Sequence, residues 1–78
     1  MKIVKFEDFL SFADDMGTRY KFFRIEDQKL QCFMVGRNGM IIYSETEKPD
    51  PKKLMEIIAK GFIETKLSKD EIKEMGLE

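Results

Sequence analysis

The stretch QCFMVGRNGMIIYS, residues 31–44, decides the fold because it joins two apolar, β-type segments through a turn-forming pair. Asn38-Gly39 is the pair that a two-residue type I′ turn favours, since both of its positions take a positive φ. We therefore predict a β-hairpin whose strands cover 29–37 and 40–46. The turn also fixes which residues of the two strands lie opposite each other.

A further β-type segment precedes this hairpin and extends its sheet. Residues 18–26 are rich in aromatic and apolar side chains, and the polar pair Asp27-Gln28 separates them from the next strand. This pattern predicts a second hairpin, so that the sheet has three antiparallel strands. Residues 1–5 form either a short edge strand or a lead-in to the first helix.

Helical patterns flank the three strands on both sides along the chain. Apolar residues recur with a period of about 3.6 over 6–16 and over 51–63, which predicts two amphipathic helices. The sequence Asp50-Pro51 supplies an N-cap and a first-turn proline for the second helix. Residues 67–78 form either a short helix, opened by the capping box Ser68-Lys69-Asp70-Glu71, or a mobile tail.

These elements predict one α+β domain over residues 1–78, with the order α-β-β-β-α(α). A chain of 78 residues is too short for two domains, because domains commonly reach about 100–150 residues. We expect a two-layer sandwich, in which the helices cover one face of the three-stranded antiparallel sheet. Two alternatives remain open: helices on both faces, which gives three layers, or a one-residue slip in the first hairpin.

The two turns divide the residues of the sheet between its faces, because residues that lie opposite each other share a face. The richer apolar set is assigned to the core beneath the helices, and it consists of Phe23, Ile25, Leu30, Cys32, Met34, Ile41 and Tyr43. The second face collects Tyr20, Phe22, Phe33, Val35 and Ile42, with Arg24 and Arg37 at its rim. The outer face of a half-covered sheet should be polar, so this aromatic face is the best functional clue in the sequence.

The second face predicts a binding function. A contiguous exposed apolar patch on a small protein marks an interaction surface, and aromatic residues with arginine are typical of interface hot spots. We expect a protein partner or a homodimer, with Arg24 and Arg37 satisfying polar groups at the rim. The alternative is a single-stranded nucleic acid, with bases stacked on Tyr20, Phe22 and Phe33. A formal net charge of −1 does not favour nucleic acid.

The sequence lacks the side chains that most catalytic and metal sites use. It contains no histidine, and Cys32, its one cysteine, falls in mid-strand on the predicted core face. We therefore predict no enzyme activity, no catalytic residue, no metal site and no cofactor, and place an enzyme or a divalent-metal-binding protein behind the two binding functions as the last alternative. No apolar run reaches the ~18 residues of a transmembrane helix, and a lone cysteine suits a reducing compartment. The expected location is the cytoplasm, with no membrane contact.

Overall fold

The computed structural model describes residues 2–15, 18–36, 39–47 and 49–75, which form an α+β domain with three helices and five strands. In chain order the elements are β1 (Lys2–Ile3), α1 (Phe6–Asp15), β2 (Thr18–Glu26), β3 (Lys29–Gly36), β4 (Ile41–Glu47), α2 (Pro51–Ala59), β5 (Ile63–Glu64) and α3 (Lys69–Met75). The predicted α+β class is confirmed, and so are the three longer strands, to within one residue at each end. Of the two forms expected for residues 67–78, the helix is present, as α3.

The sheet has the strand order β1-β4-β3-β2-β5, and its three central strands pair antiparallel. The two outer strands are only two residues long, and each pairs parallel with its neighbour, β1 with β4 and β5 with β2. The predicted three-stranded antiparallel sheet is therefore wrong in extent, because it forms only the centre of a wider mixed sheet. The pairing of β5 continues in a hydrogen bond from Thr65 N to Phe23 O, at 2.9 Å.

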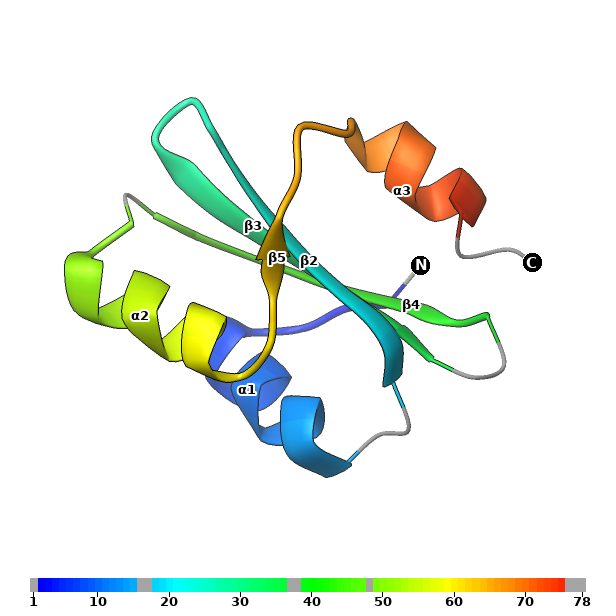
Figure 1. Cartoon of the computed structure of the whole chain (residues 1–78), viewed down its shortest axis with the longest axis horizontal. Helices are drawn as coiled ribbons and strands as arrows, with labels where there is room; N and C mark the ends of the chain where they lie inside the picture. The colour runs from blue at the N-terminus through cyan, green and yellow to red at the C-terminus, as the bar shows by residue number, and fades with distance from the viewer. Residues whose placement is uncertain (1, 16–17, 37–38, 48, 76–78) are drawn as a thin grey trace.

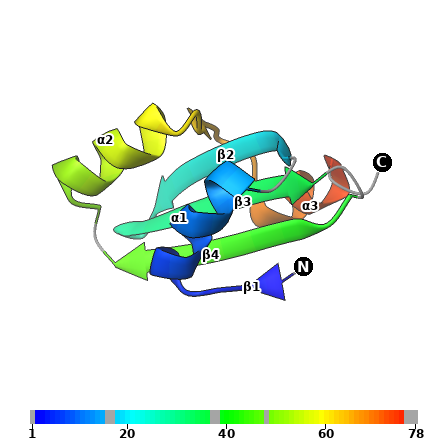
Figure 2. The same cartoon turned by 90° about the horizontal axis from the view of Figure 1, so that it is seen from below.

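The helices lie on both faces of the sheet, so the domain has three layers (Figure 1). α1 and α2 cover one face, and α3 covers part of the other; in the turned view α1 lies in front of the sheet and α3 behind it (Figure 2). The expected two-layer sandwich is wrong, and the alternative with helices on both faces is the one found. The physical reason is that the second face of the sheet is also apolar. Its burial under Ile72 of α3 removes apolar surface from water and so stabilises the fold.

Two hydrophobic cores lie on opposite sides of the sheet. The larger core, on the side of α1 and α2, contains Phe9, Phe23, Leu30, Cys32, Met34, Ile42, Ile57 and Phe62. The smaller core, on the side of α3, contains Phe33, Val35, Ile41, Tyr43 and Ile72. The central strand β3 serves both cores, because its alternate side chains are buried on opposite faces.

α2 begins as its sequence predicts and ends earlier. Asp50 is the N-cap, its Oδ1 accepts a first-turn backbone N–H at 2.7 Å, and Pro51 opens the helix. The helix ends at Ala59 rather than at residue 63, because Gly61 adopts a φ of +94° and takes the chain out of the helical path. Glycine adopts this left-handed conformation without the steric penalty of a β-carbon.

The first hairpin has the predicted register, with Phe22 opposite Phe33. The two turn residues, Asp27 and Gln28, have φ angles of 52° and 61°. Both positions are therefore left-handed, as in a type I′ turn. Neither residue is glycine, so each carries a steric cost that glycine would not.

We expect Gln28→Gly to raise the free energy of unfolding by about 1 kcal/mol, because the left-handed position then loses its steric cost. Urea denaturation followed by circular dichroism measures the change. Lys29→Gly is the matched control, since the neighbouring position is extended and glycine there should destabilise the strand by about 0.5–1 kcal/mol. Equal shifts in the two variants would contradict the role of the turn conformation.

The second hairpin differs from its predicted register by one residue. Val35 lies opposite Ile41 rather than opposite Ile42. The side chains of β4 therefore exchange faces relative to the prediction: Ile41 and Tyr43 join the smaller core, and Ile42 joins the larger one. Ile25 keeps its predicted face but is 42% exposed, so it is not a core residue.

The cause of this shift is a longer connection between β3 and β4. Gly36 N donates to Met40 O at 2.9 Å, so the connection is one residue longer than a two-residue turn allows. Gly39 has a φ of +81° and donates its N–H to Gly36 O at 3.0 Å. These features fit a three-residue connection with a left-handed glycine, the next most common hairpin type. The predicted Asn38-Gly39 turn is therefore wrong in length, and Asn38 itself lies outside the described residues.

Candidate binding surface

The sheet face beneath α3 is the surface on which the sequence predicts a binding site, and it has a polar half and an apolar half. Toward the turn between β2 and β3, one row across the strands consists of Arg24, Gln31 and Glu45. Farther from that turn, the next two rows consist of Phe22, Phe33 and Tyr43, and of Tyr20, Val35 and Ile41. Ile72 packs against the apolar rows, whereas the polar row borders an open hollow.

Two aliphatic side chains hold α3 on the apolar half. Ile72 is fully buried in the smaller core, and Leu67, in the segment that leads into the helix, packs against the same core. Lys69 extends over the Tyr43 ring, with its Nζ 4.6 Å from the ring centroid. Arg24 Nη1 donates to Leu67 O at 2.9 Å, and this bond ties the leading segment to β2.

The predicted capping box at the start of α3 is confirmed. Ser68 Oγ accepts from Glu71 N at 3.1 Å, and Glu71 Oε1 accepts from Ser68 N at 2.9 Å. The bond from the Ser68 N–H holds the pKa of the Glu71 carboxyl below its ordinary value. The box fixes where the helix begins and so which of its residues faces the sheet.

An apolar patch stays exposed beside α3, at the edge formed by β2 and β5. The rings of Tyr20 and Phe22 stack, with centroids 6.0 Å apart and planes 13° apart, and Tyr20 is 43% exposed. Ile63 lies opposite Phe22 on the same face and is 65% exposed. Tyr20, Phe22 and Ile63 are referred to as the edge patch. β5 is an outer strand, so within the described chain no further strand covers this edge.

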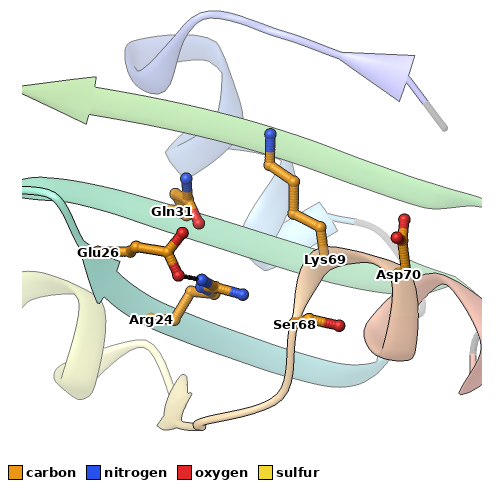
Figure 3. A pocket seen from close by; sticks show the side chains of 6 residues that line it. All are labelled: Arg24, Glu26, Gln31, Ser68, Lys69 and Asp70. Atoms are coloured by element: carbon orange, nitrogen blue, oxygen red, sulfur yellow. Dashed lines mark ion pairs between the residues drawn. The ribbon is translucent and has the colours of Figure 1, made fainter.

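A hollow of about 350 Å³ lies over the polar half, between β2, β3 and the start of α3. Its lining consists of Arg24, Glu26, Gln31, Ser68, Lys69 and Asp70. Figure 3 shows the Arg24–Glu26 ion pair on one side of the hollow and Lys69 reaching over the sheet from the other. The two cations balance the two anions, so the lining has no net charge that would favour an ion of either sign. Gln31 is 8% exposed, and its Oε1 has no hydrogen-bond partner within the described chain.

A short polar network lies on β4 beside the hollow. The Tyr43 hydroxyl donates to Glu45 Oε1, and Lys29 Nζ lies 3.3 Å from Glu45 Oε2. Burial, and then the bond to Glu45, raise the pKa of Tyr43 above its ordinary value, while the bond from Tyr43 lowers the pKa of Glu45. Both shifts move the groups away from neutral pH, so neither is suited to proton transfer there.

Five of the predicted partner-binding residues share the face beneath α3, as expected: Tyr20, Phe22, Arg24, Phe33 and Val35. Phe33 and Val35 are buried by α3, so Tyr20 and Phe22 keep the apolar surface that a partner can reach. The guanidinium of Arg24 is engaged by Leu67 O and by Glu26. It therefore stands between the edge patch and the hollow as a polar rim.

Two other predicted site residues do not join this surface. Ile42 lies on the opposite face of the sheet, buried in the larger core, because the second hairpin is shifted by one residue. That placement corrects the prediction for Ile42. Arg37 lies outside the described residues.

The structure adds residues to this surface that the sequence did not single out. Ile63 belongs to a strand of two residues, which is too short to show a periodic pattern. Leu67 and Ile72 flank the capping box, which predicts a helix but not the sheet face that the helix covers. Ile41 and Tyr43 were assigned to the other face by the register error.

Cys32 lies in the larger core with its side chain fully buried, as predicted from its position in the strand. Burial raises the pKa of the Cys32 thiol to about 12, from an ordinary value of 9.0. The thiolate, which is the nucleophilic form, is therefore rare near neutral pH. This cysteine has the character of a core residue.

We expect the Cys32 thiol to react with a disulfide reagent at pH 8 at least about 100-fold more slowly in the native chain than in urea, because both burial and the raised pKa suppress attack. The raised pKa of Cys32 also makes the free energy of unfolding fall as the pH rises from 9.0 toward 12. Over that range the unfolded thiol loses its proton while the native one keeps it. The absorbance of the thiolate that the reagent releases follows the reaction. Equal rates in the native chain and in urea would contradict the buried position of Cys32.

Among the described residues, no group of three or more His, Cys, Asp or Glu side chains is placed to hold a metal ion. In the same part of the chain, no helix is long and apolar enough to cross a membrane. No family model, characterised protein or solved structure significantly matches this chain.

Proposed function

We propose that this domain is a protein-binding module that acts through its edge patch, without catalysis, and that its simplest partner is a second copy of the chain. One observation carries the proposal: the stacked pair Tyr20 and Phe22 and the neighbouring Ile63 form one apolar patch at an outer edge of the described sheet. Burial of such a patch in a contact removes apolar surface from water. A symmetric pair needs only one self-complementary patch.

Three further features support this function. The outer strand β5 leaves an edge at which another chain can pack. Arg24 lies two residues after Phe22 on the same face of the sheet and supplies a polar rim to the edge patch. A domain of this size has a small core, and association adds stability to it by mass action.

The buried single thiol suits a reducing compartment, and we propose the cytoplasm as the location.

A single-stranded nucleic acid is the alternative partner for the same patch, since exposed rings can stack on bases. The charges around the patch do not favour it. Arg24, the cation beside Phe22, already binds Leu67 O and Glu26. Nucleic-acid affinity would fall steeply with added salt, whereas apolar association would not.

We expect Ile63→Asp to weaken self-association at least about tenfold, because the contact would then bury a charge without a partner. The measurement is solution mass by light scattering over a concentration series that reaches the high micromolar range, at low and at high salt. Ile3→Asp is the matched control. Ile3 is 70% exposed and lies in the other two-residue strand, at the opposite edge of the same sheet.

The outcomes separate the versions of this proposal. The second copy is supported as the partner if association survives added salt, is lost in Ile63→Asp and is kept in Ile3→Asp. A wild-type chain that stays monomeric at every concentration removes the second copy, and the proposal then needs an external protein whose capture shows the same dependence on Ile63. If both variants matched the wild type in mass and in capture, the edge patch would not be the binding surface.

A further inference from the structure

α3 sits on the apolar half of its sheet face in the way that a bound helical peptide sits in a groove. Among the side chains of α3 that the structure describes, Ile72 is the one that is fully buried, and Leu67 adds a second apolar contact just before the helix. Its other described side chains are polar and exposed: Lys69, Asp70, Glu71, Lys73 and Glu74. An amphipathic helix with few apolar anchors in an apolar groove is a recurrent mode of peptide recognition.

The surface beneath α3 is apolar. Phe33 and Val35 from β3 and Ile41 and Tyr43 from β4 form its floor, and Phe22 borders it. All four floor residues are buried. The floor therefore has the composition of a binding groove, with two aromatic rings 4.9 Å apart at its centre.

α3 takes no part in the described sheet or in the larger core. α3 follows β5 in the chain, and all the strand pairings of the described sheet are made by residues that precede it. The larger core contains no residue of α3. Local opening of an element with few buried contacts requires less free energy than global unfolding.

We propose that α3 is a displaceable ligand in cis, and that the groove beneath it accepts the same segment, residues 67–75, from a second copy of the chain. The argument for this occupant is complementarity already visible within one chain. Leu67 O accepts from Arg24, Lys69 lies over Tyr43, and Ile72 fills the smaller core. A second copy offers the identical set of groups, so exchange needs no new contact.

A connection of four residues joins β5 to α3. It consists of residues 65–68, which span up to about 13 Å when fully extended. Exchange between two folded copies in solution rests on the self-association proposed above. The binding of the segment in trans does not depend on it.

The first test uses Ile72→Asp in the full chain, which should release α3, and a synthetic peptide of residues 65–78. We expect the methyl resonances of Val35 and Ile41 to shift in this variant and to return toward their wild-type positions as the peptide is added, with saturation. A peptide that itself carries Ile72→Asp should not restore them. Lys73→Asp in the full chain is the matched control, because it adds the same residue at an exposed position of α3 and should leave the resonances unshifted.

The second test keeps the proposal open to refutation if Ile72→Asp fails to fold. In native-state hydrogen exchange of the wild-type chain, the Ile72 amide, which donates to Ser68 O, should exchange at least about tenfold faster than the β3 amides. Equal exchange free energies for α3 and β3, or an Ile72→Asp chain that folds and ignores the peptide, would overturn the proposal. Ile63→Asp in the same chain should leave peptide binding unchanged, so a failure of the edge patch and a failure of the groove are told apart.

Discussion

Phe9→Ala should lower the free energy of unfolding by about 3–5 kcal/mol, the usual cost of removing a fully buried aromatic ring. Phe9 is fully buried, and its ring lies 5.5 Å from that of Phe62, so one side chain joins α1, the sheet and the segment after α2. Small domains are stable by only about 5–15 kcal/mol in total, so the variant should be partly unfolded at moderate temperature. Urea denaturation followed by circular dichroism measures the loss.

Phe9→Leu is the control for this substitution. Leucine keeps most of the apolar volume, and we expect a loss below about 1.5 kcal/mol. The difference between the two variants then reports the cavity rather than the change of residue type. A loss below about 1 kcal/mol in Phe9→Ala would mean that α1 does not pack on the sheet as described.

Phe33→Ala should have a comparable effect from the opposite side of the sheet, again about 3–5 kcal/mol. Phe33 is fully buried in the central strand, and its ring lies 4.9 Å from that of Tyr43. The variant removes the ring of one of the four residues against which Ile72 packs. We therefore expect the α3 amides to lose protection in hydrogen exchange by a larger factor than the β-strand amides.

Phe22→Ala provides the comparison for Phe33→Ala. Phe22 faces the same side of the sheet from β2 but is only half-buried, so its truncation should cost about 1–2 kcal/mol. If the two variants lost equal stability, the smaller core would not be packed, and α3 would not depend on it.

The long strands and the capped helices could be predicted from the sequence because each carries a local signal. Asp50-Pro51 and the capping box at Ser68 fix helix starts through bonds between residues at most three positions apart. The turn at Asp27-Gln28 has its predicted register because a two-residue connection allows no other pairing. These features depend on neighbouring residues alone.

The faces of β4 could not be predicted correctly, because they depend on one residue in a turn. Asn-Gly favours a two-residue connection, but Gly36 pairs with Met40, so a longer one is formed. A shift of one residue moves every side chain of a strand to the opposite face. That is why Ile42 was predicted at the binding surface and lies in the larger core.

The rest of the candidate site arises from contacts between distant parts of the chain. Ile63 reaches the edge patch only because β5 pairs with β2, about 40 residues earlier in the sequence. Ile72 covers Phe33 although either sheet face would have offered it apolar surface. A pattern along the chain indicates that a helix has an apolar side, but it does not say which surface that side will meet.

The parallel pairing of the two outer strands implies an order of assembly. The antiparallel meander joins residues as close as Glu26 and Lys29, whereas Lys2 pairs with Ile42 and Phe22 with Ile63, which lie 40 (42 − 2) and 41 (63 − 22) positions apart. Closing the longer loops costs more chain entropy, so β1 and β5 should join last during folding. In that order of assembly β4 and β2 would be the open edges until β1 and β5 join. We therefore expect a chain that has not yet added its two outer strands to be more exposed to aggregation than the finished fold.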